Sequence, residues 1–313
     1  MILLTGATGF VGQAVLRRLL SDDVSQKVVV SLRKYGTVWP AQVKPLVVGD
    51  LLPDTDLSDA LDGVSLVVHS AARVHIMHDQ SVDPLAAFRL VNVAGTLNLA
   101  RQAAASGVKR FVFVSSVKVN GESTAIGQAF SENDMASPQD AYGQSKHEAE
   151  QGLRQVGAET GMEVVIIRPP LVYGSGVKAN FAALMRAVQR GWFLPLGAIN
   201  NQRSLVALDN LVDLIVNCLH HPKAANQTFL VSDGQDLSTT ELVRGIAQAA
   251  MVSPRLLPVP VIVLRALASL VRKDDAVERL CGNLQVDISK ARELLGWVPP
   301  VTVQEGLKRA MNG

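Results

Sequence analysis

Short apolar runs alternate with helix-like stretches through the first part of the chain. Each run is nearly continuous in apolar residues instead of alternating apolar with polar positions. This pattern is typical of parallel strands that helices cover on both faces, so it predicts an α/β fold with a doubly wound parallel sheet. The expected strands are Ile2–Leu4, Val28–Leu32, Pro45–Val48, Val64–His69, Arg110–Ser115 and Val164–Arg168, and the expected helices include Val11–Leu20 and Phe88–Ala105.

The rhythm changes after Pro169-Pro170, where proline and glycine become more frequent. We therefore predict a nucleotide-binding domain over residues 1–170 and a smaller α/β lobe over residues 171–313, interleaved with the last strands of the sheet. The expected elements of this lobe are helices at Phe181–Arg190, Leu211–Leu219, Thr239–Ala250 and Val261–Val271, and a short strand at Phe229–Val231.

Composition narrows the class of protein. Hydrophobic residues make up 48% of the 313 residues and charged residues 19%, with a net charge of +2, and there is no long Lys/Arg run. An ordinary globular protein that does not bind nucleic acid is expected. The two cysteines, Cys218 and Cys281, do not form a C-x-x-C pair, and His75 and His78 lack further ligands nearby, so no metal site is expected.

One apolar stretch, Leu256–Val271, raises the question of membrane contact. Pro258, Pro260 and Arg265 interrupt it, and it is shorter than the ~20 residues of a membrane span. We expect a core or lobe-packing helix, with contact to a membrane surface as the alternative. The N-terminus lacks the basic region and cleavage site of a signal peptide, so we expect a cytoplasmic protein.

A glycine-rich turn follows the first expected strand and opens the first expected helix. Gly6 permits a tight turn, Gly9 lets backbone N–H groups approach a pyrophosphate, and Gly12 lets the helix pack closely on the strand. This is the dinucleotide-binding turn of a Rossmann fold. The predicted cofactor contacts in it are Gly6, Thr8, Gly9, Phe10, Val11 and Gly12.

The end of the second strand bears on the choice of cofactor. An acidic residue there usually binds the ribose of NAD, whereas this chain has Arg33, which could pair with a 2′-phosphate. The sequence therefore favours NADP(H), with NAD(H) as the alternative. Further residues expected along the cofactor groove are Asp50, Leu51, Ala71, Ala72, Arg73 and Asn92.

Tyr142 and Lys146 are the strongest candidates for catalysis. Residues four apart on a helix share a face, and an ammonium group together with the positive ring of an oxidised cofactor would lower the pKa of the tyrosine towards neutrality. Ser116 ends the fifth expected strand beside Ser115, where its hydroxyl could bond a substrate oxygen whose charge changes. These groups suit hydride transfer at a carbon that bears oxygen.

With these motifs the whole chain resembles the extended short-chain dehydrogenase/reductases, the NAD-dependent epimerase/dehydratase family; the segment Arg168–Gly174 also matches. The resemblance implies catalysis by Ser116, Tyr142 and Lys146, a UDP-sugar substrate and a homodimer. It implies that Ser115, Tyr142, Lys146, Pro169 and Val172 line the cofactor site. It also implies substrate contacts at His75, Ser116, Lys118, Tyr142, Asn180, Leu196, Arg203 and Arg279, in which the two arginines clamp a diphosphate.

Three reactions compete within the family. Dehydration needs an extra acidic group after the catalytic serine, where this chain has Val117-Lys118. Arg33 and two segments resembling bacterial UDP-4-keto-6-deoxy-N-acetylhexosamine 4-reductases favour NAD(P)H-dependent 4-ketoreduction, which would yield N-acetylquinovosamine- or fucosamine-type precursors of surface polysaccharide. A UDP-hexose 4-epimerase with tightly bound NAD is the alternative. A non-catalytic NADP-binding regulator is the alternative from another class, which usually loses the tyrosine or the lysine.

Overall fold

The computed structural model describes residues 1–23, 25–34, 36, 38–74, 83–270 and 274–312, and a parallel sheet organises it. The strands of this sheet are β1 (Ile2–Thr5), β2 (Val28–Leu32), β3 (Val43–Val47), β4 (Leu66–His69), β5 (Arg110–Val114), β6 (Glu163–Arg168) and β9 (Thr228–Leu230). Their order is β3-β2-β1-β4-β5-β6-β9, with every neighbouring pair parallel. The doubly wound fold expected from the apolar runs is confirmed. The order reverses between β1 and β4, where sheets of this kind bind ligands outside the carboxyl ends of the strands.

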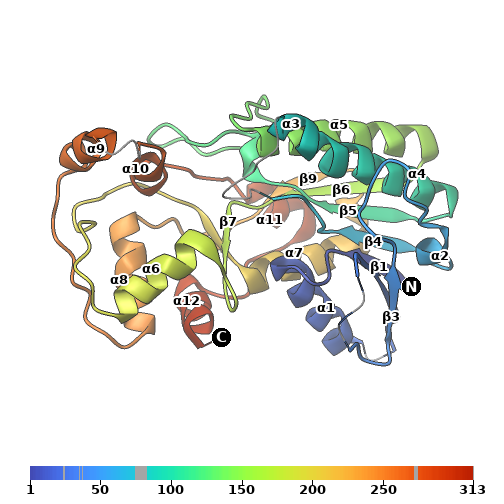
Figure 1. The fold of residues 1–313 in the computed structure, drawn as a ribbon, viewed down its shortest axis with the longest axis horizontal. Coiled ribbons are helices and arrows are strands. Elements are labelled where there is room, and N and C mark those ends of the chain that lie inside the picture. The colour runs from blue at the N-terminus through green and yellow to red at the C-terminus, as the bar shows by residue number, and fades with distance from the viewer. Residues whose placement is uncertain (24, 35, 37, 75–82, 271–273, 313) are drawn as a thin grey trace.

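Helices cover both faces of the sheet (Figure 1). On one face, apolar residues of α1 and α7 join those of the strands in one core; on the other, α2, α4 and α5 pack on a second core around Phe111 and Phe113. Both faces of each central strand are therefore buried, which explains the near-continuous apolar runs. The helices are α1 (Phe10–Asp22), α7 (Leu208–His220), α2 (Ser58–Leu61), α3 (Pro84–Phe88), α4 (Thr96–Ala105) and α5 (Ala141–Thr160).

The stretch 88–105, expected as one helix, is interrupted. Its first turns form a π-helical segment, Arg89–Gly95, between α3 and α4. A Cβ at Gly95 would lie 2.0 Å from the carbonyl oxygen of Leu51, so only glycine permits this approach to the loop after β3. Such π-helical segments occur frequently at functional sites.

The second lobe has its own core and a small parallel sheet, β7 (Leu171–Tyr173) with β8 (Leu205–Ala207). Tyr173 stacks on Phe181 at 5.5 Å, and its hydroxyl donates to the Asp233 carboxylate at 2.6 Å. Residues after 171 also contribute strand β9 to the larger sheet and helix α7 to one of its faces, so the chain passes repeatedly between the two parts. The remaining helices are α6 (Ala179–Gln189), α8 (Thr239–Ala249), α9 (Val261–Leu270), α10 (Asp274–Cys281), α11 (Ser289–Leu295), α12 (Val303–Asn312) and the 3-10 turns Val117–Val119 and Pro222–Ala224.

Helix α9 departs from the expectation of a core or lobe-packing helix. Val261 and Leu264 pack against the core of the second lobe, but Ile262 and Leu267 are 77% and 56% exposed. The helix is apolar on nearly all sides, so a single packed side cannot bury it. Within the described parts of the chain, no helix combines the length and apolar character needed to cross a bilayer.

Candidate active site

The glycine turn lies at the carboxyl end of β1. Gly6 has a φ of +72°, and a Cβ there would lie 2.7 Å from the backbone nitrogen of Ala71. A Cβ at Gly12 would lie 2.1 Å from the Gly6 carbonyl oxygen, which is closer than packed atoms approach. Thr8 and Gly9 are exposed at the start of α1, with Phe10 and Val11 in its first turn. The turn therefore fits a dinucleotide pyrophosphate, which needs bare backbone and a helix N-terminus.

A buried histidine, missed in the sequence, ties this turn to β4. His69 lies between two threonines: its Nδ1 is 2.6 Å from Thr5 Oγ1 and its Nε2 is 2.9 Å from Thr96 Oγ1. Burial, and secondarily the charge of Lys146, lowers the pKa of His69 to about 3, so the ring is neutral. Because the Ala71 N–H also donates to Thr5 Oγ1, this chain of bonds holds Ala71-Ala72 beside Gly6. The sequence held one signal for this role of His69, which is a polar residue at the end of an apolar strand.

Arg33 and Asp50, expected at the adenosine end, face each other. Their closest side-chain atoms are 3.9 Å apart, and the side chains are 81% and 63% exposed. An exposed pair of this kind contributes little to stability. The pair bears on the choice of cofactor, because the Asp50 carboxylate beside Arg33 affects which groups the guanidinium can bind.

Asn92 connects the π-helical segment to α5. Its Oδ1 accepts the backbone N–H of Arg73 at 2.8 Å, and its Nδ2 donates to the Arg73 carbonyl and to Ser145 Oγ, each at 3.0 Å. The Arg73 guanidinium also lies over the Phe88 ring at 5.7 Å. Asn92 therefore holds the loop after β4 against α5. His75, expected to contact substrate, lies outside the described residues.

Tyr142 and Lys146 lie on one face of α5, as the four-residue spacing predicts. The Asp140 carboxylate caps the helix by accepting the Gly143 N–H at 2.7 Å. Lys146 is buried; its Nζ donates to the Val114 carbonyl at 2.8 Å and lies 5.9 Å from the centre of the Tyr142 ring. Lys146 thus contacts the carboxyl end of β5, and Ser116 begins the 3-10 turn Val117–Val119 directly after that strand.

Burial dominates the protonation of this pair. It raises the pKa of Tyr142 above its usual value, and the charge of Asp140 adds to that rise. It lowers the pKa of Lys146 to about 7, opposed by Glu150. The sequence predicted a lowered tyrosine pKa from an ammonium group together with the cofactor's positive ring. In the protein by itself, burial and the Asp140 charge shift the Tyr142 pKa in the opposite direction.

Behind the pair lies a buried ionic network that sequence reasoning missed. Glu150, one helical turn after Lys146, accepts the Ser115 hydroxyl at 2.6 Å and two bonds from Arg168 at 2.9 and 2.6 Å. Arg168 also donates to Asn120 Oδ1 at 3.0 Å. The Ser115 hydroxyl is therefore directed to Glu150. The network joins α5, β5 and β6 directly behind the candidate catalytic groups.

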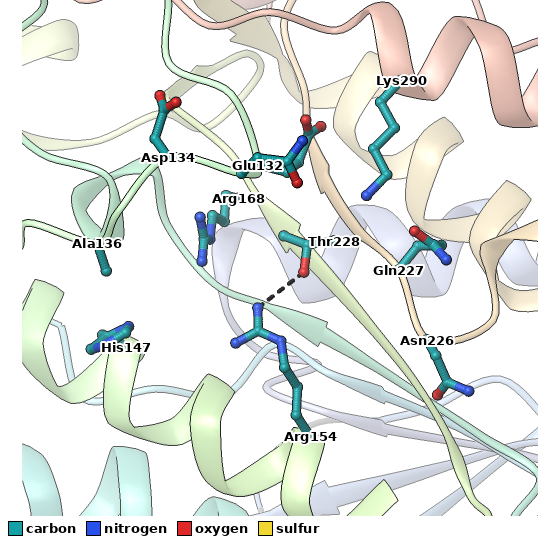
Figure 2. Close-up of a pocket in the computed structure, with 11 residues that line it drawn as sticks. Glu132, Asp134, Ala136, His147, Arg154, Arg168, Asn226, Gln227, Thr228 and Lys290 are labelled. Carbon is teal, nitrogen blue, oxygen red and sulfur yellow. Dashed lines mark hydrogen bonds between the residues drawn. The ribbon is translucent and has the colours of Figure 1, made fainter. Parts of the chain in front are cut away.

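A polar cavity of about 370 Å³ lies beside this network at the β9 edge of the sheet (Figure 2). Arg154 reaches across its wall, donating to Thr228 Oγ1 and to Glu150, each at 3.1 Å. The cationic side chains of its lining, Arg154, Arg168 and Lys290, are offset by Glu132, Asp134 and the adjoining Glu150. We assign this cavity a structural role, because both of its arginines donate hydrogen bonds to Glu150.

Lys118, expected to contact substrate, is engaged by two carboxylates. Its Nζ donates to Glu122 at 2.7 Å and to Asp140 at 2.5 Å. Burial works against its charge, but these two bonds raise the pKa of Lys118 above the usual value. The arrangement holds the start of α5, and with it Tyr142, against the 3-10 turn.

The residues of the second lobe that were predicted to contact substrate lie in different environments. Arg203 donates to the Gly282 carbonyl at 3.1 Å; burial lowers its pKa, and Glu122 and Glu278 oppose that shift. Leu196 is buried, Asn180 is exposed in the first turn of α6, and Arg279 lies in the last turn of α10. Near the predicted domain boundary, the Pro169 carbonyl accepts the Val117 N–H at 3.0 Å, and Val172 on β7 packs on the main core.

Asn201, not singled out in the sequence, connects these environments. Its Nδ2 donates to the carbonyls of Leu280 and Gly282 at 3.1 and 2.8 Å, and its Oδ1 accepts the Thr239 N–H at 2.8 Å. The end of α10 is thereby held beside the segment that carries Arg203. The two predicted diphosphate-binding arginines consequently lie on adjoining segments.

Comparison with known proteins gives a consistent family. Residues 2–232 match the model of the NAD dependent epimerase/dehydratase family. A relative from Vibrio cholerae named UDP-glucose 4-epimerase is 52% identical over 310 residues, covering 98% of this chain and 93% of the relative. A relative from Escherichia coli O157:H7, named N-acetyl-alpha-D-glucosaminyl-diphospho-ditrans,octacis-undecaprenol 4-epimerase, is 30% identical over 325 residues, covering 99% and 94%.

Solved structures agree in fold. The UDP-glucuronic acid 4-epimerase of Bacillus cereus in complex with NAD has a TM-score of 0.79 at 21% identity, covering 99% of this chain and 97% of that one. The UDP-glucose 4-epimerase of Thermotoga maritima with UDP-glucose has a TM-score of 0.76 at 22% identity, with the same coverage.

These findings overturn the predicted 4-ketoreductase and its likeness to 4-reductases, because the 52% identical relative is named an epimerase. The reason is chemical. Both reactions use the same serine, tyrosine and lysine. Arg33, which was taken to favour reduction, pairs with Asp50 and does not report where the hydride goes. A preference for NADP is not shown either.

The family model spans most of the chain, and the 52% identical relative covers it nearly end to end. The chain belongs to the NAD dependent epimerase/dehydratase family.

Proposed function

We propose that this protein is a UDP-hexose 4-epimerase that retains NAD through its cycle. The observation that carries the proposal is the 52% identity, over 98% of the chain, to a relative named UDP-glucose 4-epimerase. Tyr142 and Lys146, side by side on α5, support hydride chemistry at a sugar carbon.

In this proposal Tyr142 takes the proton of the sugar 4-hydroxyl as hydride leaves C4, and it returns that proton when hydride is delivered to the other face of the ketone. NAD, when bound in the glycine turn, supplies the hydride acceptor and gives the hydride back, so no net reductant is consumed. Ser116 bonds the same oxygen. Because burial raises the pKa of Tyr142, proton abstraction depends on positive charge nearby, which Lys146 supplies when protonated.

The adenosine end supports NAD as the resident cofactor. A 2′-phosphate bound by Arg33 would approach the Asp50 carboxylate, whose side chain is within 3.9 Å of the guanidinium. Like charges at that separation oppose each other. The Arg33–Asp50 pair therefore disfavours the extra phosphate of NADP.

For the substrate, we propose that Arg203 and Arg279 hold the diphosphate while Leu196 packs on the base. The position of Arg203 supports this role. Its side chain is partly buried and donates to the Gly282 carbonyl. The charge of Glu122, which bonds Lys118 near the candidate catalytic groups, acts on the Arg203 guanidinium. The phosphate-binding and catalytic segments thus approach each other.

A second candidate substrate is a sugar diphosphate on a lipid carrier. The Escherichia coli O157:H7 relative is named for such a compound, and the exposed apolar side of α9 in the substrate lobe favours a chain that works near lipid. The two candidates differ in the group attached to the diphosphate, and the two relatives are also named for different sugars, glucose and N-acetylglucosamine.

The experiment incubates the purified protein, without added cofactor, with UDP-glucose, UDP-N-acetylglucosamine or the lipid-linked N-acetylglucosamine diphosphate. Sugars are separated after mild acid hydrolysis, and nicotinamide absorbance is followed. We expect approach to a gluco/galacto equilibrium without net change in absorbance, and NAD released on denaturation. A protein that interconverts none of the three substrates would contradict the proposal. Tyr142→Phe serves as the inactive control.

A further inference from the structure

The substrate lobe ends in a cluster of exposed apolar side chains. On α9, Ile262, Val263 and Leu267 are 77%, 42% and 56% exposed, and they neighbour one another on the helix surface while Ala268 faces inward. Trp192 and Phe193 are 57% and 65% exposed. We call this cluster, together with the 44% exposed Leu257, the lobe tip.

Backbone pairing makes the lobe tip one surface. The Leu194 N–H donates to the Arg255 carbonyl at 2.9 Å, and the Leu257 N–H donates to the Leu194 carbonyl at 2.8 Å. The aromatic pair 192–193 is therefore held beside the segment that leads directly into α9. Figure 1 places α9 at the end of the molecule opposite the N-terminal strands. Exposed apolar side chains gathered in this way mark interaction sites.

The two stretches of chain that carry the lobe tip contain cations and no acidic residue, while Glu278 of the neighbouring α10 pairs with Arg265 of α9 at 3.1 Å. Residues 178–208 contain Lys178, Arg186, Arg190 and Arg203, residues 242–270 contain Arg244, Arg255 and Arg265, and neither stretch contains an aspartate or a glutamate. The guanidinium of Arg255 lies over the Phe193 ring at 5.3 Å, and that of Arg190 lies over Trp192 at 5.9 Å. The exposed aromatic rings are thus bordered by cations, although the chain as a whole carries a net charge of only +2.

We propose that the lobe tip docks the protein on a membrane surface that contains anionic phospholipid. Aromatic and aliphatic side chains enter the boundary between headgroups and acyl chains, while the bordering arginines remain at the phosphates. α9 has ten residues, so it lies in the interface and does not cross it. The proposal is independent of which sugar is epimerised.

The charge pattern argues for lipid over a second copy of the chain. Two lobe tips that met through their exposed aromatic rings would bring Arg190 and Arg255 of both copies together, and like charges repel. An anionic lipid surface is complementary to the same arginines.

The lobe tip also adjoins the proposed substrate segment. The Gly197 N–H donates to the Leu257 carbonyl at 2.9 Å, and the Leu196 carbonyl accepts the Thr240 hydroxyl at 2.6 Å. Docking would therefore bring the segment proposed to hold the nucleobase close to the membrane surface.

The test sediments the full-length protein with vesicles of phosphatidylethanolamine and phosphatidylglycerol, or of phosphatidylcholine alone. We expect binding to the anionic vesicles that weakens with added salt, and at least about tenfold weaker binding to phosphatidylcholine. Trp192 emission should shift to shorter wavelength on binding, and Trp192→Phe should remove that shift. Absence of binding to anionic vesicles would overturn the proposal.

Matched variants distinguish docking through the lobe tip from nonspecific binding to vesicles. The double variant Ile262→Asp/Leu267→Asp places two charges on the lobe tip and should weaken vesicle binding at least about tenfold. The control, Ile126→Asp/Met135→Asp, makes the same change at side chains that are 90% and 91% exposed elsewhere, and it should bind within about twofold of the parent. Both variants should keep epimerase turnover of a UDP-sugar.

Two results would overturn the proposal even if vesicles bind. One is equal loss of binding in the lobe-tip and control variants. The other is an oligomer of the parent protein, seen by size exclusion with light scattering, that only the lobe-tip variant dissociates; a second copy would then cover this surface.

Discussion

Arg168 and Glu150 form a buried ion pair directly behind the Tyr142–Lys146 pair. The guanidinium donates Nε and Nη2 to the two carboxylate oxygens at 2.9 and 2.6 Å, and both side chains are almost fully buried. Ser115 also bonds this carboxylate. The position of β5 relative to α5, and so the position of Ser116 relative to Tyr142, depends on Glu150.

Removing the charge of Glu150 should destabilise the protein strongly. In Glu150→Gln, Arg168 keeps a buried charge without its carboxylate, so the free energy of unfolding should fall by about 3–5 kcal/mol. Urea denaturation measures the change. On the same helix, Glu148 pairs with Arg89, whose side chain is 50% exposed, and Glu148→Gln should lose less than about 1 kcal/mol. Equal losses in the two variants would show that burial of the pair is not the cause.

Tyr142→Phe should lower kcat by about 10²–10⁴-fold with KM within a few-fold of the parent. The phenyl ring keeps the edge contact with Phe88, whose centroid is 6.0 Å away, and loses only the proton-transferring oxygen. Steady-state kinetics on the epimerised sugar checks this. A variant that retained most of the parent kcat would exclude Tyr142 from proton transfer.

Lys146 should make stability depend on pH. Its pKa is about 7 in the folded protein and 10.5 ordinarily, so below about pH 7 both states hold the proton and the cost of burying the ammonium is fully present. Between these values the unfolded state binds more protons, so the free energy of unfolding rises with pH by at most about 1.4 kcal/mol per unit.

Lys146→Met removes that titration. Urea denaturation of both proteins from about pH 6 to about pH 10 measures the free energy of unfolding. The variant's free energy of unfolding relative to the parent's should be highest at low pH and lowest at high pH. A difference between them that is constant across this range would mean that Lys146 is not desolvated as its burial implies.

Gly12→Ala should disrupt the cofactor turn. The new Cβ would meet the Gly6 carbonyl oxygen at 2.1 Å, so the strand and helix must separate. We expect lower thermal stability and loss of NAD from the purified protein, measured by release on denaturation. Gly245→Ala is the control, because its Cβ would meet only the end of the Leu307 side chain, which can rotate. Retention of NAD in Gly12→Ala would contradict the proposed cradle.

Patterns carried by neighbouring residues were readable from the sequence. Near-continuous apolar runs identified the strands β1, β2 and β6 within a residue or two, because burial on both faces leaves no polar positions. The spacing of Gly6, Gly9 and Gly12 identified the turn, and the four-residue interval placed Tyr142 and Lys146 on one helical face. The direction of hydride transfer was not readable, because epimerases and reductases share these residues.

Features that join distant segments required the folded chain. His69 bonds Thr5 and Thr96, Glu150 bonds Arg168, and Asp50 faces Arg33, although no local periodicity links these positions. The sequence of α9 specified an apolar helix but not how many of its sides find a partner. Apolar periodicity records which side chains avoid water, whereas burial depends on what the rest of the chain brings to each side, and that is why only the tertiary structure exposed the lobe tip.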